Sequence, residues 1–229
     1  MPRMARRAAI GKTPEDISLD TGVVDTTPRG RILAAAERLF AKKGLHGAGL
    51  REIAREADVN VNLITYHFNS KDSLYLHVHE TRARLLNNIR ERTLEELDQK
   101  YAPGAPPVEQ IIRAFVHPFF ILKAMDPDIW VNFIRSYMRE IGTGIWQEMN
   151  ANSLAPIIGR FTAILHRSLP AASRSDILFV LGLAIHGAVM AADPDEASIV
   201  GEGLAGDLTP ERLEERLVRA LTTVAQQYS

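Results

Sequence analysis

Apolar residues recur every three or four positions along most of the chain, which is the spacing of helices with one buried face. The first stripe follows Thr27-Pro28, a start signal in which proline takes the first helical position, and it stops at Gly44. Its members are Ile32, Leu33, Ala36, Leu39 and Phe40. Few runs show the alternation of a strand, so the pattern predicts an all-α fold.

Residues 50–68 hold two short helical patterns separated by a break. The apolar face of the first pattern consists of Leu50, Ile53, Ala54 and Ala57. Asp58 follows, and its short polar side chain tolerates the left-handed backbone that a tight turn needs. Asn60 is placed to cap the second pattern, in which Ile64 and Phe68 continue the buried side. This spacing predicts a helix-turn-helix.

The other face of the second short helix carries chemistry suited to DNA. A helix of about two turns is unstable alone, so neighbours must hold it while its outer face meets a partner. Asn62 can bond base edges, and Val61 and Leu63 can meet thymine methyl groups. The residues expected to fix the register on phosphates are Thr65, Tyr66, His67, Arg51 and Lys71, with Asn60 at the helix start. The alternative is an ordinary three-helix corner without a partner.

A long fourth helix is expected from Ser70 to about Lys100, with Lys71 at an N-terminus that attracts phosphate. Its apolar positions are Leu74, Leu85, Ile89, Leu94 and Leu97. The proline-rich stretch 101–107 ends it. Later helical patterns, which bring the total to about nine helices, cover residues 111–125, 127–141, 145–169, 175–192 and 210–227. Pro118 is expected to kink the first of these, and Pro156 either kinks the third or starts it anew.

The run from Arg31 to Leu74 resembles the DNA-binding domain of the tetracycline-repressor (TetR) family of transcription regulators. The matching residues are Ile32-Leu33-Ala34-Ala35-Ala36, Leu39-Phe40, Gly44, Ile53-Ala54, Ala57, Val59 and Tyr66-His67-Phe68-Asn69-Ser70-Lys71-Asp72. The chain departs from the family at Gly49, usually Thr, at Asp58, usually Gly, and at Thr65, most often Tyr. The resemblance implies a homodimeric, ligand-responsive regulator, most commonly a repressor. It also implies a three-helix helix-turn-helix domain joined by a long helix to an all-helical ligand-binding and dimerisation domain.

Charge is distributed unevenly along the chain. Residues 1–82 carry 13 Lys and Arg against 10 Asp and Glu, whereas residues 83–229 carry 14 against 18. The positive end coincides with the predicted helix-turn-helix, as phosphate contact requires. We divide the chain into a basic arm at 1–28, a DNA-binding domain at 29–75 and a helical ligand-binding and dimerisation domain at 76–229. The arm is either a solvated tail or a segment that follows phosphates or enters a minor groove.

Aromatic residues are concentrated in the central helices. They either fill the core or line a cavity for a small apolar or aromatic molecule, and the residues alone leave both interpretations open. The family resemblance favours a ligand cavity. The residues assigned to it are Phe115, His117, Phe119, Trp130, Phe133, Tyr137 and Trp146.

Residues 175–192 are apolar on almost every side, so a helix there must be covered on more than one face. We expect this helix to pack against the last helix and against the same two helices of a second chain. The residues assigned to that dimer interface are Leu178, Leu181, Ile185 and Leu217. The alternative is an internal helix of a monomer.

Composition and the absence of known motifs limit the classes of protein to which the chain can belong. With 229 residues, 46% of them hydrophobic and 24% charged, the chain is typical of a globular protein. The absence of cysteine excludes disulfides and fits a cytoplasmic location, and no stretch has the pattern of a signal peptide or a membrane span. Phosphate-loop, nucleophile-elbow and dinucleotide motifs are missing, and His77 and His79 lie on different sides of a helix. We therefore expect no enzymatic activity, cofactor or metal.

Overall fold

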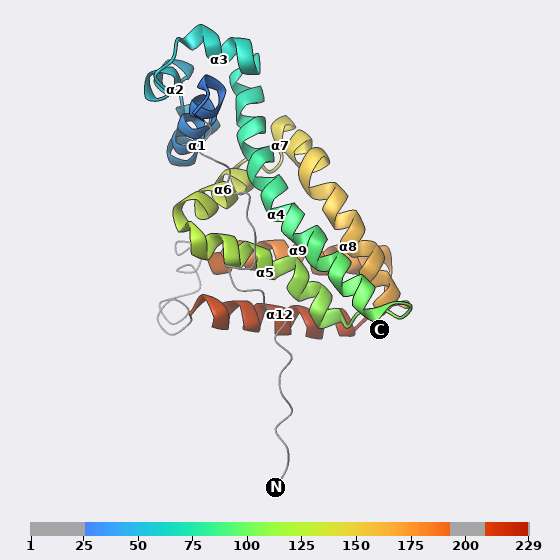
Figure 1. The fold of residues 1–229 in the computed structure, drawn as a ribbon. Coiled ribbons are helices and arrows are strands. Elements are labelled where there is room, and N and C mark those ends of the chain that lie inside the picture. The colour runs from blue at the N-terminus through green and yellow to red at the C-terminus, as the bar shows by residue number, and fades with distance from the viewer. Residues whose placement is uncertain (1–25, 193–208, 229) are drawn as a thin grey trace.

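The computed structural model describes residues 26–192 and 209–228. Figure 1 shows a small group of helices at one end of the long helix α4, with the other helices packed along the rest of it. Within the described ranges no residue forms a strand. The predicted all-α class, with a helix-turn-helix joined by a long helix to an all-helical second part, is confirmed. Most of the expected basic arm at 1–28, up to residue 25, lies outside the described residues.

The first helix, α1 (Pro28–Gly47), begins at the predicted signal. The Thr27 hydroxyl accepts a hydrogen bond from the Gly30 N–H at 3.1 Å, and Pro28 takes the first helical position. Gly44 has a φ of 70° and interrupts the regular helix, as its predicted role at the helix end implies. A Cβ at Gly44 would meet only the end of the flexible Arg139 side chain, so the backbone conformation, not the space, favours glycine.

The helix-turn-helix consists of α2 (Leu50–Glu56) and α3 (Val61–Phe68). Asp58 adopts a φ of 52° in the turn between them. The Asn60 side chain accepts a hydrogen bond from the Asn62 N–H at 2.8 Å and so caps α3. Gly49 precedes α2 without a side-chain cap, as its missing side chain dictates.

The helix α4 (Lys71–Tyr101) has 31 residues and is therefore about 46 Å long. Ser70 caps it by accepting a hydrogen bond from the Ser73 N–H at 3.0 Å. In its middle the buried positions are Leu86 and Arg90, whereas Leu85 and Ile89, which the sequence pattern placed inside, are only partly buried. The predicted stripe is therefore wrong by one position there.

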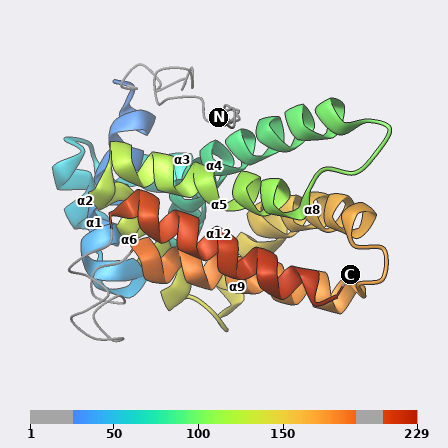
Figure 2. The same cartoon turned by 90° about the horizontal axis from the view of Figure 1, so that it is seen from below.

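The remaining helices pack along α4 and against one another. Their bounds are α5 (Val108–Met125), α6 (Pro127–Arg139), α7 (Gly144–Met149), α8 (Ala155–Ser168), α9 (Arg174–Ala192) and α12 (Pro210–Gln226). The view in Figure 2 shows α9 and α12 side by side. The predicted pairing of residues 175–192 with the last helix is confirmed within one chain, where Leu217 covers Gly187.

One predicted helix is divided. The pattern at 145–169 is a short α7, a π-helical segment η1 (Asn150–Leu154) and then α8, with Pro156 in the first turn of α8. Of the two alternatives for Pro156, the restart is the one observed. Pro118 lies inside α5, which continues as one helix on both sides of it.

Buried apolar residues form two clusters. One lies among α1, α2, α3 and the start of α4, and it includes Ile32, Ile53, Ile64 and Phe68. The other lies among the later helices and includes Phe115 and Phe161. Met149 of α7 is the member of the first cluster that comes from the later helices. The clusters separate along α4 near the boundary expected at residue 75, which we retain as a proposal.

Among the described residues, Arg174–Ala191 in α9 is long and apolar enough to cross a membrane. The sequence expectation that no stretch reaches this length was therefore too strict. The core helix of a globular protein has the same length and composition. One side of α9, including Ile177 and Ala184, is buried against the helices around it.

Candidate functional site

The helix α3 is anchored by its buried side. Ile64 and Phe68 are each 1% exposed and belong to the N-terminal cluster. The turn before α3 is tied to α1, because the Arg31 Nε donates a hydrogen bond to the Ala57 carbonyl at 3.0 Å. The Val59 N–H donates to the Ala54 carbonyl at 3.0 Å and closes the turn. These contacts fix the direction in which the outer face of α3 points.

The structure brings the predicted DNA-contact residues together on and around that outer face. Tyr66 is 80% exposed, and its ring contacts that of His67 edge-on, with the ring centres 5.2 Å apart. The other exposed residues of the set are Arg51, Asn60, Asn62 and Thr65. The half-buried residues of the set are Val61, Leu63, His67 and Lys71. Val61 and Leu63 pack partly against the N-terminal cluster, so they present only part of their surface to a partner.

Positive charge flanks α3 on two sides. Lys71, the first residue of α4, points its ammonium to the Ala48 carbonyl at 3.4 Å, and this keeps it near the start of α2. Arg29 was missed by the sequence reasoning. Its guanidinium lies 5.3 Å from the centre of the Phe68 ring at the end of α3, and its side chain is exposed. In the sequence, the only indication of this role was that a basic residue follows Pro28 directly, in the first turn of α1.

The aromatic residues predicted to line a ligand cavity are only partly brought together. Phe119, Phe133 and Tyr137 line one pocket, the central pocket, between α4, α5, α6, η1 and α9. The remaining predicted residues, which line no part of it, are Phe115, His117, Trp130 and Trp146. His117 instead pairs with Glu214 of α12 through a 2.9 Å contact, and Trp130 packs edge-on against Phe119 and Phe133 in the core. Phe115 and Trp130 pack in the core, and His117 contacts Glu214, so these three residues do not line the central pocket.

Two polar residues of the central pocket were missed. His79 is 4% exposed. Its ring stacks on those of Phe133 and Tyr137, with ring centres 4.7 and 5.4 Å away. Neither ring nitrogen has a hydrogen-bond partner among the described residues. Burial lowers the pKa of His79 to about 3, so the ring is neutral at pH 7. Arg90 is 6% exposed and takes the place of an apolar residue between Leu86 and Leu94, which was the signal in the sequence.

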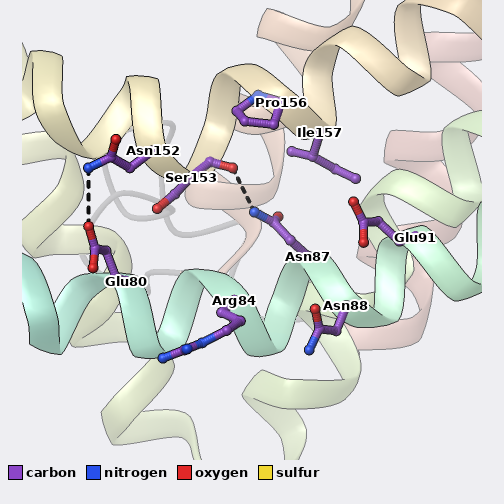
Figure 3. Close-up of a pocket in the computed structure, with 9 residues that line it drawn as sticks. All are labelled: Glu80, Arg84, Asn87, Asn88, Glu91, Asn152, Ser153, Pro156 and Ile157. Carbon is purple, nitrogen blue, oxygen red and sulfur yellow. Dashed lines mark hydrogen bonds between the residues drawn. The ribbon is translucent and has the colours of Figure 1, made fainter.

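A second, larger pocket lies outside the central pocket. This outer pocket, drawn in Figure 3, has a volume of about 380 Å³ between α4 on one side and η1 and the start of α8 on the other. Figure 3 shows two hydrogen bonds across it, from the Asn152 side chain to Glu80 at 3.2 Å and from the Asn87 side chain to the Ser153 carbonyl at 2.7 Å. Asn87 and Ser153 also line the central pocket, so the second bond separates the two.

A third pocket, of about 820 Å³, lies between α1, α4 and α6. The contacts around it join the helix-turn-helix to the later helices. Arg82 of α4 forms a two-pronged ion pair with Glu37 of α1, and the Tyr75 hydroxyl donates to the Ser136 carbonyl of α6 at 3.3 Å. His79 and Phe133 line both this pocket and the central pocket. The helix α6 also contacts α1 directly, so this pocket lies where the later helices meet the helix-turn-helix.

The outward side of α9 carries exposed apolar residues. They are Leu178, Phe179, Leu183 and Met190, and Phe179 is 55% exposed. Of the four residues predicted for a dimer interface, Leu178 lies on this face. Leu181 is 1% exposed and packs in the core of its own chain, Ile185 lines the central pocket, and Leu217 packs on Gly187. The assignment of Leu181 is corrected, because its side chain is buried within its own chain. Leu178, Ile185 and Leu217 keep exposed surface, so their place in a dimer interface stays a prediction.

Two family models match the chain. The model of the bacterial regulatory proteins of the tetR family matches residues 32–78, and the model of the tetracyclin repressor-like C-terminal domain matches residues 113–223. The chain is 34% identical over 93 residues to the HTH-type transcriptional activator FasR of Mycolicibacterium smegmatis, covering 40% of this chain and 38% of FasR. It is 28% identical over 141 residues to the transcriptional dual regulator CecR of Shigella flexneri, covering 59% and 61%.

The fold also has solved counterparts. A TetR-family transcriptional regulator from Streptomyces coelicolor superposes with a TM-score of 0.60 at 18% identity, covering 88% of this chain and 96% of that one. The curated relatives are matched over less than two thirds of their own length. The chain belongs to the TetR family of bacterial regulatory proteins, and its helix-turn-helix, α2 and α3, lies within the residues that the first family model matches.

Proposed function

We propose that this regulator is a cytoplasmic homodimer that represses transcription from a near-palindromic operator and is released by a small molecule. The observation that supports it most directly is the outer face of α3, which is exposed while Ile64 and Phe68 hold the helix in place. On this face Asn62, Val61 and Leu63 are proposed to read bases. The residues proposed to contact phosphates are Thr65, Tyr66, His67, Arg51, Lys71 and Arg29, with Asn60 setting the start of α3.

The exposed apolar face of α9 supports the homodimer. An aromatic and three aliphatic or thioether side chains on one helix face lose contact with water when two chains pack together. A two-fold dimer would present two copies of α3 to successive major grooves about 34–36 Å apart. Such symmetry matches a near-palindromic site, because each half-site meets the same residues.

The central pocket supports control by a ligand. Its wall contains Phe133 and Tyr137 of α6, and α6 contacts α1. A molecule that binds more tightly to a widened pocket would favour a position of α6 that also shifts α1 and α3. Operator binding then weakens by the ratio of the ligand's affinities for the two states.

Two substitutions test the DNA interface. Lys71→Ala removes a phosphate contact, so we expect it to weaken binding to all duplexes and to reduce the salt dependence by about one counterion. Asn62→Ala removes a base contact, so we expect a change in sequence preference. Lys100→Ala is the matched control, since it removes a lysine from the opposite end of the same helix, about 44 Å away. Operator and random duplexes are titrated at several salt concentrations. Parent-like binding by both variants would contradict the assignment.

The alternative is a DNA-binding dimer without small-molecule control. One observation favours it, namely that the central pocket is only about 60 Å³ in volume. Under this alternative the aromatic residues serve the core alone. Thermal denaturation in the presence of apolar compounds separates the two, because a ligand raises the melting temperature as its concentration rises.

A further inference from the structure

The guanidinium of Arg90 is buried in the helical domain without a carboxylate partner among the described residues. Its Nε donates to the Phe115 carbonyl at 2.9 Å, its Nη1 donates to the Asn87 side chain at 3.3 Å, and its carbon lies 4.0 Å from the centre of the Phe115 ring. Burial lowers the pKa of Arg90 to about 9, so the group is still charged at pH 7. A buried charge without a counter-ion is costly, and an anion beside it would remove that cost.

A second group without a partner lies at the other end of the central pocket. His79 is on the same helix as Arg90 and eleven residues earlier, which places it about 16 Å away along α4. Its two ring nitrogens are buried and have no hydrogen-bond partner among the described residues, and the neighbouring Tyr137 hydroxyl is buried beside the Trp146 side chain. A neutral imidazole offers one donor and one acceptor, so this end suits an uncharged polar group.

The wall between these two ends is apolar. Ala83 and Leu86 of α4 lie between His79 and Arg90 along the helix, and Phe119, Ile134 and Ile185 come from three other helices. A ligand that fits this wall has a hydrocarbon body. The order along the pocket is therefore a buried cation, an apolar middle and a neutral polar end.

We propose that the central pocket binds an elongated apolar monocarboxylate, an inference that rests on the ligand control proposed above. Its carboxylate accepts hydrogen bonds from the Arg90 guanidinium, and a hydroxyl or carbonyl at its far end meets His79 and Tyr137. The pocket volume of about 60 Å³ means that such a ligand must separate α4 from α6, and this separation is the signal sent to α1.

Chain-matched probes test the carboxylate on the full-length parent protein. Dodecanoate, dodecanol and dodecylammonium are titrated by calorimetry below their micelle concentrations. We expect the dissociation constant of dodecanoate to be at least tenfold lower than that of dodecanol, and dodecylammonium not to bind. We expect 12-hydroxydodecanoate to bind at least threefold more tightly than dodecanoate. Equal binding of the acid and the alcohol, or tighter binding of the ammonium, overturns the proposal without the need for any variant.

Substitutions then assign the two ends. Arg90→Met is expected to raise the dissociation constant of dodecanoate at least tenfold and to leave that of dodecanol within twofold. A merely structural role for Arg90 predicts equal losses for both probes. Arg92→Met, which removes an exposed arginine from the same helix, is the matched control. His79→Phe keeps a stacking ring but should abolish the preference for the hydroxylated probe, and retention of that preference contradicts the assignment of this end.

The same samples are tested for binding to an operator selected from random duplexes. Operator binding that dodecanoate weakens in the parent but not in Arg90→Met supports both proposals. If the operator is bound and the acid binds no better than the alcohol, the carboxylate proposal fails while the regulator stands. If the carboxylate preference is found but no duplex is selected, the proposed function fails and the assignment of the pocket stands.

Discussion

Protonation of His79 is expected to destabilise the folded protein in mild acid. Its folded-state pKa is lowered to about 3 from an ordinary value of 6.5, because the ring is 4% exposed. Between these two values the unfolded chain binds a proton that the folded chain does not, so stability is complete above pH 6.5 and declines as the pH falls. From pH 7.5 to pH 5.0 this one group should lower the free energy of unfolding by about 2 kcal/mol.

His79→Phe removes this titration while it keeps an aromatic ring between Phe133 and Tyr137. Because buried nitrogens without partners are also removed, we expect the variant to be about 1–3 kcal/mol more stable than the parent at pH 7.5. The difference should grow by about 2 kcal/mol at pH 5.0. The carboxylates titrate in both proteins, so their contribution cancels in the comparison.

Urea denaturation of both proteins, at one subunit concentration and at several pH values, measures the effect. His166→Phe is the matched control, since His166 is exposed. Parallel stability curves for the parent and His79→Phe between pH 7.5 and 5.0 would refute the reasoning, because they would mean that His79 binds protons equally in the folded and unfolded chains.

Three further substitutions follow from the site. Asp58 has a φ of 52°, which glycine adopts more easily, so Asp58→Gly should raise the free energy of unfolding by up to about 1 kcal/mol in denaturation. The same substitution removes a negative charge near α3 and should therefore tighten operator binding. Phe179→Glu should shift the protein towards monomer in sedimentation, whereas Gln99→Glu at the end of α4 should not; an unchanged dimer would exclude this face of α9. Tyr75→Phe removes the bond to Ser136 and should cost about 1 kcal/mol in denaturation; no loss would show that this contact between α4 and α6 contributes nothing.

The fold was predictable where a local signal sets the backbone. Thr27, Asn60 and Ser70 each cap the helix that the sequence assigns to them, and Asp58 adopts the left-handed turn expected of a short polar residue. These features depend on hydrogen bonds and sterics within a few residues, so a single sequence contains them. The π-helical segment at 150–154 carries no such signal, and its position among α4, α7 and α8 had to come from packing.

The candidate sites show the same division. The exposed face of α3 follows from helical period alone, because the buried positions Ile64 and Phe68 fix the opposite side. The residues that line the central pocket could not be predicted from the spacing, since aromatic side chains in a core and around a cavity recur at the same positions. Trp130 packs in the core, and His117 contacts Glu214. His79 and Arg90 line the central pocket, but they lie on α4, which the sequence pattern predicted only as a helix linking the two domains. On α9, Leu181 and Phe179 are two residues apart, and the packing of the helices around α9 decides which of them is covered.

The central claim is that two copies of α3 in one dimer read a two-fold symmetric duplex. Selection of bound sequences from random duplexes by the full-length protein tests it most directly. The account predicts enriched sites made of two inverted half-sites whose centres are about one helical turn apart, and a loss of specificity at defined bases with Asn62→Ala. Enrichment of a single asymmetric half-site, or of no sequence at all, would contradict it.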